Sequence, residues 1–383
     1  MKTFLGIGLG PIQTSIFLDG AFRGGFDRLV IADVDTALIE SIRANDGTIR
    51  INIASNTEVT TETISGVEIY NPTVPEEAAK LVEAAAMADE VATALPSIAF
   101  FKHLGWLKEG FGKEPDRRRF VYAAENHNHA AEELEKEIGS FANTQTLNTV
   151  IGKMSCIFPA EECVRRDIPT LTPDADRGHL VEAFNKILIQ SCDGLSERMV
   201  QGLYDKPDLL PFEEAKLYGH NAVHLWLGLY AQQNGALFMH EMADEVDLLA
   251  WARKAFVDES GVALCKKWAG VDELFTSDGF AAYADDLLER MVNPYLTDRV
   301  DRVCRDLERK LSWDDRLIGT MRVVLSQDVF PNVFAEGAAK AAVHLFGKDV
   351  EKIRAGFEAL WGVWNEEATF VWLQIAPHLR EEI

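Results

Sequence analysis

The chain opens with an apolar segment, a glycine-containing turn and a helical pattern, and this order of elements strongly limits the possible fold. Phe4 to Gly8 has the short apolar character of a buried strand, and Gly8-Leu9-Gly10-Pro11 continues directly into the helical stretch Ile12 to Leu18. Glycines between a strand and a helix let the backbone approach an anionic group, which the helix N-terminus can then bind. The start of the chain therefore predicts an α/β domain with a phosphate-binding turn.

Strand-like and helical segments alternate through the first half of the chain and then give way to helices. Arg28 to Asp33, Glu90 to Ala94 and Phe120 to Ala124 are strand-like, and Ala78 to Ala88 is helical. Strands separated by helices favour a parallel sheet with crossover helices. From about Leu209, long amphipathic stretches dominate, such as Ala243 to Val257 and Phe280 to Val292. We predict an α/β Rossmann-type domain over residues 1–200 and a mainly α-helical domain over residues 201–383.

The end of the second predicted strand carries a carboxylate. Asp33 follows Gly8 by 25 residues (33 − 8), close to the spacing of about 20 at which an acidic side chain accepts hydrogen bonds from an adenosine ribose. Such a carboxylate would repel the 2′-phosphate of NADP, although Asp35 competes for the role and either could be a helix cap. Gln13 replaces the third glycine of the Gly-x-Gly-x-x-Gly fingerprint. We expect Gly8, Gly10, Ile12 and Asp33 to bind a dinucleotide, with NAD preferred over NADP.

Glu125-Asn126 follows the strand-like segment Phe120 to Ala124. The carboxyl ends of strands in a doubly wound sheet face the ligand crevice. Asn126 could therefore donate a hydrogen bond to a reacting oxygen or to the nicotinamide ribose, or it could simply form a turn. The neighbouring His127 and His129 are expected to be solvated at the start of a helix.

Lys216, Asn221 and His224 place an amine, an amide and an imidazole within nine residues of an apolar stretch. On a helix with about 100° per residue, Asn221 lies about 140° and His224 about 80° from Lys216, so one broad face can hold all three. These groups suit proton transfer to and from an oxygen, although ordinary helix residues would give the same pattern. His220 and His224 also admit a zinc site, with His240 or Glu241 as a third ligand. However, Asn221 stands where His-Glu-x-x-His has its general base.

A basic run occupies Asn293 to Ser312 in an otherwise acidic chain. It could form a pocket for substrate hydroxyls or a phosphate, with Arg302 and Lys310 among its cations. It could equally be a charged helix face paired with Asp298, Asp301 and Asp306. The run Arg117 to Arg119 is interpreted as a solvated loop edge.

Composition sets limits on partners and location. The chain has 38 Lys and Arg against 61 Asp and Glu, a formal charge of −23 and a pI near 4.8, which disfavours nucleic acid and anionic membranes. It has no apolar run of the ~20 residues that span a bilayer, and its N-terminus is interpreted as a strand rather than a signal peptide. Five unclustered cysteines favour free thiols in a reducing cytoplasm. The sequence leaves a monomer and a homodimer equally open.

The chain as a whole resembles the polyol-specific long-chain dehydrogenases, and within them the mannitol-1-phosphate 5-dehydrogenase branch. The likeness covers essentially the whole chain. Four motifs carry it: Ile31-Ala32-Asp33-Val34, Glu125-Asn126, Lys216-x4-Asn221-x2-His224 and Asn293-Pro294-Tyr295-Leu296. Pro11 and Ala124 depart from the branch, which usually has Asn and Cys at these positions. Gly152-Lys153 stands where the branch has an Asp-Arg pair.

The resemblance implies a Rossmann domain, a helical domain, an active site between them and metal-independent oxidoreduction with NAD. By the resemblance, Lys216 is the general acid/base, Asn221 and Asn126 stabilise the developing alkoxide, and His224 orients the substrate. Arg302 and Lys310 match positions that contact substrate oxygens, and Lys153 is a further substrate-binding candidate. The expected reaction interconverts mannitol 1-phosphate and fructose 6-phosphate. A non-phosphorylated polyol, a sugar acid or a sugar conjugate is the alternative; a zinc hydrolase and a non-catalytic dinucleotide-binding protein are the remaining ones.

Overall fold

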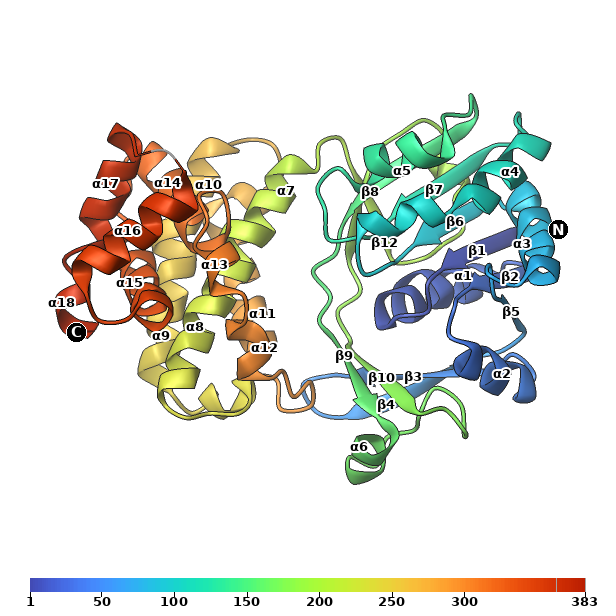
Figure 1. The fold of residues 1–383 in the computed structure, drawn as a ribbon, viewed down its shortest axis with the longest axis horizontal. Coiled ribbons are helices and arrows are strands. Elements are labelled where there is room, and N and C mark those ends of the chain that lie inside the picture. The colour runs from blue at the N-terminus through green and yellow to red at the C-terminus, as the bar shows by residue number, and fades with distance from the viewer. Residues whose placement is uncertain (363, 383) are drawn as a thin grey trace. The chain divides into compact units, whose positions relative to one another are not determined.

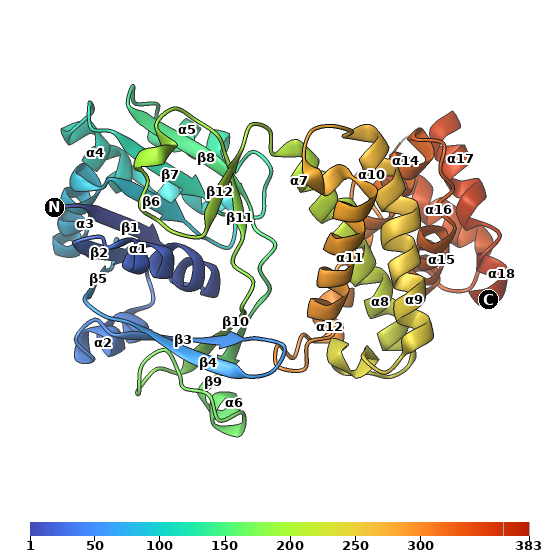
Figure 2. The ribbon, with the colours of Figure 1, turned by 180° about the vertical axis from the view of Figure 1, so that it is seen from behind.

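The computed structural model describes residues 1–362 and 364–382 and divides into two compact units, Met1–Leu209 and Leu210–Ile383. The first unit is built on a parallel sheet and the second is helical (Figures 1 and 2). The predicted fold class is therefore confirmed. The change between the units falls nine residues after the predicted boundary (209 − 200).

An eight-stranded sheet organises the first unit. Its spatial order is β12-β11-β8-β7-β6-β1-β2-β5, and the six strands from β5 to β8 pair in parallel. Renumbered along the chain, those six strands read 3-2-1-4-5-6, the order of a Rossmann fold. Their bounds are β1 (Thr3–Ile7), β2 (Arg28–Ala32), β5 (Val67–Tyr70), β6 (Glu90–Thr93), β7 (Arg119–Ala123) and β8 (Thr144–Val150), with β11 (Ile187–Gln190) and β12 (Leu203–Lys206) completing the sheet.

Alternate residues of the central strands face two separate apolar layers. Phe4, Ile31 and Tyr122 belong to one core cluster and Leu5, Val30 and Val121 to the other, as expected for strands buried on both faces. The first cluster packs against η1 (Gln13–Leu18), α1 (Asp19–Gly24) and α2 (Thr36–Ala44); the second packs against α3 (Pro75–Met87), η2 (Ile98–His103), α4 (Gly105–Lys113) and α5 (Ala130–Ile138).

A second, four-stranded sheet extends the first unit, and the sequence patterns did not predict it. Its order is β4-β3-β10-β9. It joins the Rossmann part through a buried contact, because the Thr14 hydroxyl lies 3.0 Å from Nδ1 of His179. Burial lowers the pKa of His179 to about 3, so this imidazole is neutral. The bounds are β3 (Ile49–Ala54), β4 (Val59–Ile64), β9 (Ser155–Pro159) and β10 (Arg177–Glu182). Helix α6 (Ala160–Arg165) lies between β9 and β10, and η3 (Leu195–Glu197) lies between β11 and β12.

The second unit packs its helices around large apolar side chains, among them Trp226, Phe256 and Phe334. The indole of Trp226 donates to the carbonyl of Val333 at 3.0 Å, and a Cβ on Gly337 would overlap the same ring. No helix among the described residues is long and apolar enough to cross a bilayer. The helices are α7 (Leu210–Glu214), η4 (Ala215–Asn221), α8 (Ala222–Gln233), η5 (Met239–Met242), α9 (Val246–Lys254), η6 (Ala255–Gly261), α10 (Val262–Lys267), η7 (Glu273–Phe275), α11 (Ser277–Met291), α12 (Val300–Cys304), α13 (Leu307–Lys310), α14 (Arg316–Ser326), α15 (Asn332–Phe346), α16 (Val350–Trp361), α17 (Glu366–Ile375) and α18 (Leu379–Glu382).

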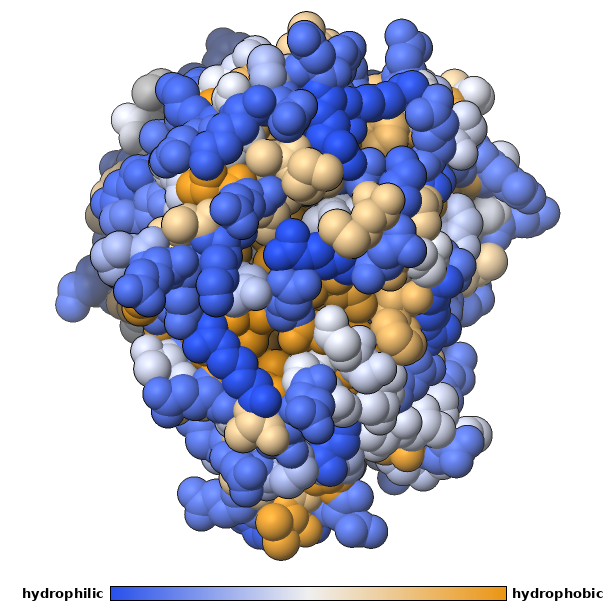
Figure 3. All heavy atoms as spheres, turned by 90° about the vertical axis from the view of Figure 1, so that its right-hand side faces the viewer, coloured by the Kyte–Doolittle hydropathy of each residue, from blue (hydrophilic) through white to orange (hydrophobic). Residues whose placement is uncertain are grey.

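The surface is largely polar. The face drawn in Figure 3 is mainly hydrophilic, and apolar atoms are visible in a hollow near its centre. A strongly negative net charge of −23 favours solubility of the folded chain but repels anionic ligands. An anionic substrate therefore needs a local group of cations.

Candidate active site

The glycine turn at the end of β1 is held in a shape that glycine favours. Gly8 has a φ of +82°, and a Cβ there would lie 3.0 Å from the carbonyl oxygen of Ala94. Its amide donates to the carbonyl of Ala32 at 2.8 Å. Gly10 differs, because a Cβ at this position would meet no atom within 4 Å. The open space beside Gly10 is where a ligand's phosphate could approach the backbone.

Asp33 lies beside this turn at the end of β2. Its Oδ2 accepts from the amide of Leu9 at 2.7 Å, and its Oδ1 accepts from the amide of Asp35 at 2.9 Å. Asp35 has a different role, because it caps α2 by accepting from the Leu38 amide and pairs with Arg177 at 2.6 Å. Arg177 is the largest influence on the pKa of Asp35, which is lowered. Of the two carboxylates, Asp33 is thus the one fixed against the glycine turn.

The missing third glycine has a structural replacement. Ile12 begins the helical conformation, and Gln13 starts the π-helix η1 with its side chain fully buried. A Cβ on Gly6 of β1 would overlap Nε2 of Gln13. The third glycine of the fingerprint normally permits close packing of helix on strand. In this protein the glycine is on the strand, at Gly6, and the space beside it is filled by the side chain of Gln13 from the helix.

Glu125 and Asn126 end β7 at the same edge of the sheet. Glu125 is buried: its Oε1 accepts from the Leu95 amide and its Oε2 from the Thr93 hydroxyl, each at 2.8 Å. Burial raises the pKa of this carboxyl group, although both hydrogen bonds oppose the shift. Glu125 thereby fixes the turn after β6, next to the point between β1 and β6 where the strand order reverses. Asn126 is exposed, and its amide is unpaired within the described part of the chain.

These features fit a dinucleotide. The positive-φ glycine turn, the open space at Gly10 and the carboxylate of Asp33 all lie at the carboxyl ends of the parallel strands. Ligands of doubly wound sheets bind where the strand order reverses. Gly8, Gly10, Ile12, Asp33 and Asn126 remain the residues predicted to hold NAD.

Lys216 occupies a π-helix rather than an α-helix. η4 spans Ala215–Asn221 and carries Lys216 and Asn221, while His224 follows in α8. The angles predicted for 100° per residue therefore do not apply, since a π-helix bonds i to i+5. Burial lowers the pKa of Lys216 to about 8; the cation of Arg316 contributes in the same direction and Glu213 opposes it. Neither the Lys216 ammonium nor the Asn221 amide has a protein partner among residues 1–362 and 364–382.

His224 is positioned by a carboxylate from the Asn293–Asp298 loop. Its Nε2 lies 3.1 Å from Oδ2 of Asp298, an ion-pair distance without the alignment of a hydrogen bond. Arg302 donates to Oδ1 of the same carboxylate through Nε at 2.8 Å and Nη2 at 2.6 Å. Burial acts to raise the pKa of Asp298, but His224 and Arg302 outweigh it and hold the pKa below its ordinary value. The Asp298 carboxylate thus lies against the imidazole of His224 and is itself held by Arg302.

The loop before Asp298 is strained. Thr297 has a φ of +48° and is buried, and a β-branched residue rarely adopts this conformation. Strain of this kind persists only where the surroundings impose it, and it is common at functional sites. Sequence reasoning treated Asp298 only as a helix-face partner and missed its contact with His224.

His220 is buried beside His224, with ring centroids 5.9 Å apart. Burial lowers its pKa far below the ordinary value, and the nearby charges of His224, Arg290 and Lys216 add to the effect. Glu241, one suggested third zinc ligand, accepts instead from the amides of Leu237 and Phe238. A search of the described residues finds no group of three His, Cys, Asp or Glu side chains arranged to hold a metal.

The three predicted substrate-binding cations are all engaged within the protein. Arg302 pairs with Asp298 as described. Lys310 is buried and donates to the carbonyls of Val303, at 2.7 Å, and Arg305; burial lowers its pKa to about 8. Lys153, in the first unit, donates to the carbonyl of Phe184 at 2.9 Å and is also buried. Their role toward a substrate remains a prediction.

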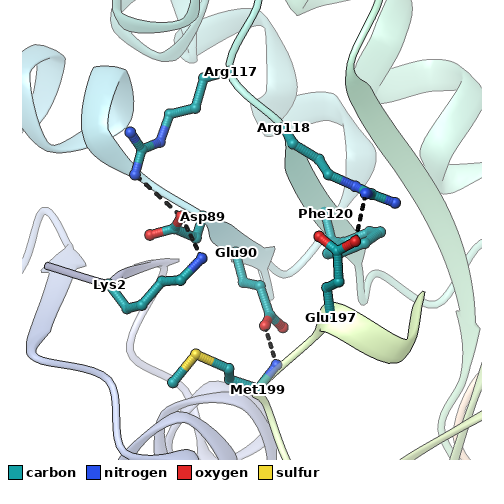
Figure 4. Close-up of a pocket in the computed structure, with 8 residues that line it drawn as sticks. All are labelled: Lys2, Asp89, Glu90, Arg117, Arg118, Phe120, Glu197 and Met199. Carbon is teal, nitrogen blue, oxygen red and sulfur yellow. Dashed lines mark hydrogen bonds and ion pairs between the residues drawn. The ribbon is translucent and has the colours of Figure 1, made fainter. Parts of the chain in front are cut away.

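Arg117 to Arg119 lie at the opposite, amino-terminal edge of the first unit's sheet, and the prediction of a solvated loop edge is wrong for one of them. Arg119 is fully buried and donates to the carbonyl of Ala86 at 2.8 Å because it starts strand β7, whose sides are both covered. Arg117 and Arg118 line a pocket of about 220 Å³ (Figure 4), where they pair with Asp89 and Glu197. This pocket, with its charges paired internally, therefore lies at the other end of the strands from the glycine turn.

Comparison with known proteins agrees with this geometry. Residues 208–356 match the family model described as the mannitol dehydrogenase C-terminal domain. Mannitol-1-phosphate 5-dehydrogenase of Enterococcus faecalis is 26% identical over 338 residues, covering 86% of this chain and 83% of the relative. The mannitol 2-dehydrogenase of Pseudomonas fluorescens, solved as a ternary complex with NAD and D-mannitol, superposes with a TM-score of 0.70 at 15% identity, covering 99% of this chain and 90% of the other. A substrate-free D-sorbitol dehydrogenase gives 0.73 at 14% identity, covering 100% and 92%.

The Rossmann sheet with its glycine turn, together with a helical unit that carries Lys216, defines the class of two-domain dinucleotide-dependent dehydrogenases. More narrowly, the second unit matches the mannitol dehydrogenase C-terminal model, and most of the chain is similar in sequence to mannitol-1-phosphate 5-dehydrogenases. The two solved structures, at 15% and 14% identity, add agreement in fold.

Proposed function

We propose that this NAD-dependent polyol dehydrogenase interconverts a sugar alcohol, or its phosphate, and the corresponding ketose, with Lys216 as the general acid/base. The preferred pair is mannitol 1-phosphate and fructose 6-phosphate, as in the name of the Enterococcus faecalis relative. The observation that carries the proposal is the Lys216 ammonium: it is partly desolvated, it lacks a partner among the described residues, and its pKa is about 8. A catalytic base works best when its pKa lies near the working pH.

In alcohol oxidation, neutral Lys216 would take the hydroxyl proton as negative charge develops on the oxygen. NAD held at the glycine turn and Asp33 would supply the hydride acceptor for the carbon that bears this oxygen, and NADH would supply the hydride in the reverse direction. The unpaired amide of Asn221 would donate a hydrogen bond to that oxygen, an effect of roughly 3 kcal/mol in comparable oxyanion sites. His224, which lies 3.1 Å from the Asp298 carboxylate, would orient the substrate hydroxyls.

On the cofactor side, the backbone at Gly10 would bind the pyrophosphate, since the amides of Gly8 and Leu9 already donate within the protein, and Asp33 would bind the adenosine ribose. The exposed amide of Asn126 is proposed to donate to the nicotinamide ribose or the reacting oxygen. These roles rest on the position of each residue at the carboxyl edge of the sheet and on the family motifs.

The test combines a substrate screen with one substitution. We expect NADH oxidation with fructose 6-phosphate, compared against fructose, hexuronates and pentuloses. Lys216→Ala should lower kcat by at least ~100-fold, while NADH still binds, because the dinucleotide residues lie in the other unit. Lys266→Ala is the matched control, since Lys266 is an exposed lysine of the same unit. Unchanged turnover in Lys216→Ala would refute the role of Lys216.

A further inference from the structure

Arg316 begins α14, and this helix packs against η4, the segment that carries Lys216. Gly319 allows the close approach, because a Cβ there would lie 2.7 Å from the ring of Tyr218. The Thr320 hydroxyl lies 3.3 Å from the Tyr218 carbonyl and donates to it. Arg316 precedes Thr320 by one helical turn and so lies on the same face of α14. Its side chain therefore starts next to η4.

The guanidinium of Arg316 has one protein contact and one open edge. Its side chain is 16% exposed, and Nη1 donates to Oδ1 of Asp315 at 3.1 Å. Nε and Nη2 have no partner in the described ranges 1–362 and 364–382. This Nε–Nη2 edge binds carboxylates elsewhere in the protein: Arg28 uses it to hold both oxygens of Glu68, at 2.9 and 2.7 Å. Arg316 therefore presents a free fork of the kind that grips an oxyanion.

The one carboxylate in contact with Arg316 is shared. Asp315 also accepts from Nη1 of Arg309 at 2.7 Å and from the backbone amide of Arg316 at 2.7 Å. One carboxylate thus contacts two guanidinium groups, and the charge of Asp306 acts on Arg316 more weakly than that of Asp315. The surplus positive charge is partly desolvated, since burial lowers the pKa of Arg316. Burying an unpaired charge destabilises the folded protein unless an anion pairs with it.

The same cation acts on the groups around it. It lowers the pKa of Lys216 and of Lys310, each as the largest influence after burial. By contrast, Arg302 uses both Nε and Nη2 on Asp298, and Lys310 is bonded to backbone carbonyls. Among these cations near the candidate site, Arg316 has the open bidentate edge.

We propose that Arg316 binds the anionic substituent of the substrate, a phosphate or carboxylate carried by the sugar, and so selects charged over neutral sugars. This inference rests on the proposed function of Lys216. The Nε–Nη2 edge would take two oxygens of the anion, while Lys216 acts at the reacting hydroxyl. In an acidic chain, this arrangement supplies the local positive site that an anionic sugar requires.

The experiment compares ketose reduction at pH 7 for fructose 6-phosphate, a keto-hexuronate and neutral fructose. The wild type should prefer at least one anionic sugar, and the preferred one identifies the anion as phosphate or carboxylate. Arg316→Ala should lower kcat/KM for that sugar by about 100-fold, as expected for loss of a bidentate charged pair, and change fructose by less than about threefold. At pH 7 Lys216 is protonated with or without Arg316, so its pKa does not enter the comparison.

Arg316→Lys keeps the charge but removes the two-donor edge, so kcat/KM should fall about 10-fold for the anionic sugar alone. This variant provides the test if Arg316→Ala does not fold. Arg253→Ala, at an exposed arginine of the same unit, controls for net charge and should leave the preference unchanged. Equal losses on charged and neutral sugars, unchanged kinetics in both variants, or a wild type without preference for an anion would overturn the inference. Absence of NADH oxidation with every ketose would instead refute the proposed function.

Discussion

The dinucleotide edge of the first unit and the η4–α14 region of the second are built in opposite ways. At the first, most of the predicted contacts are backbone groups and one carboxylate between Gly8 and Asp33, and only Asn126 comes from farther along the chain. At the second, side chains come from Lys216 to His224, from Asp298 and Arg302, and from Arg316, a spread of 100 residues (316 − 216). A binding motif can therefore be local, whereas a proton-transfer site depends on tertiary packing.

The two regions also differ in how their polar groups are satisfied. Both oxygens of Asp33 already accept backbone hydrogen bonds, so this carboxylate is held in place by the protein itself. In the second region, the polar groups of Lys216 and Asn221 have no protein partner within the described residues. Preorganised donors left free in a partly desolvated site can be used on a transition state. This difference matches the roles proposed above, cofactor binding in the first region and proton transfer in the second.

The sharpest way to break this comparison is Asp298→Asn. The account predicts that kcat falls by about 100-fold, because the imidazole of His224 loses the carboxylate that orients it and small misplacements are this costly. NADH affinity should stay within about twofold of wild type, since Asp298 belongs to the second unit. Steady-state kinetics and NADH titration measure both quantities.

Asp301→Asn is the matched control for Asp298→Asn. Asp301 pairs with Arg299 at the surface, with 64% of its side chain exposed, and such pairs contribute little to stability. A kcat that is equally insensitive to both substitutions would contradict the positioning role of Asp298. A large loss of NADH affinity in Asp298→Asn would contradict the assignment of cofactor binding to the first unit.

A smaller effect is expected at the cofactor edge. Asp33→Ala should weaken NADH binding by about 10-fold, the value of one charged hydrogen bond, and weaken NADPH binding less because the repulsion of the 2′-phosphate is removed. Fluorescence titration with both nucleotides measures the ratio. Asp35→Asn provides the control, because Asp35 caps α2 and pairs with Arg177. That variant should lower the melting temperature while leaving nucleotide selectivity intact. Equal losses of NADH and NADPH in Asp33→Ala would argue against a ribose contact.

Much of the fold could be predicted from the sequence. The apolar runs at β1, β2, β6 and β7 and the helix at α3 follow directly from hydrophobic patterning. The four-stranded sheet was not predicted. Its strand β3 does alternate apolar and polar residues from Ile49 to Ile53, a strand signal that the prediction overlooked. Strands β9 and β10 join β3 and β4 from more than 90 residues away (155 − 64), and no local pattern encodes such long-range pairing.

The residues of the candidate site could be predicted only where they lie close together in the sequence and form a short motif. Residue types and spacing pointed to Lys216, Asn221 and His224, but not to the π-helical turn or to the contact of His224 with Asp298. In the sequence, Arg316 cannot be distinguished from the other arginines of its region. Its unpaired Nε–Nη2 edge results from tertiary contacts in which Asp315 pairs with both Arg309 and Arg316. Similarly, Arg119 looked solvated although it starts a buried strand. Charged residues acquire a role from the packing around them, which the local sequence does not encode.

The pH dependence of kcat/KM tests the central claim, that Lys216 exchanges the proton, most directly. For ketose reduction by the NADH complex, the account predicts a plateau below about pH 8, the pKa of Lys216, since the protonated amine is the acid. Above it the rate should fall tenfold per pH unit, and alcohol oxidation should show the opposite trend. The residual activity of Lys216→Ala should lack this transition. A profile that is flat between about pH 7 and pH 9.5, or one that Lys216→Ala retains unchanged, would contradict the account.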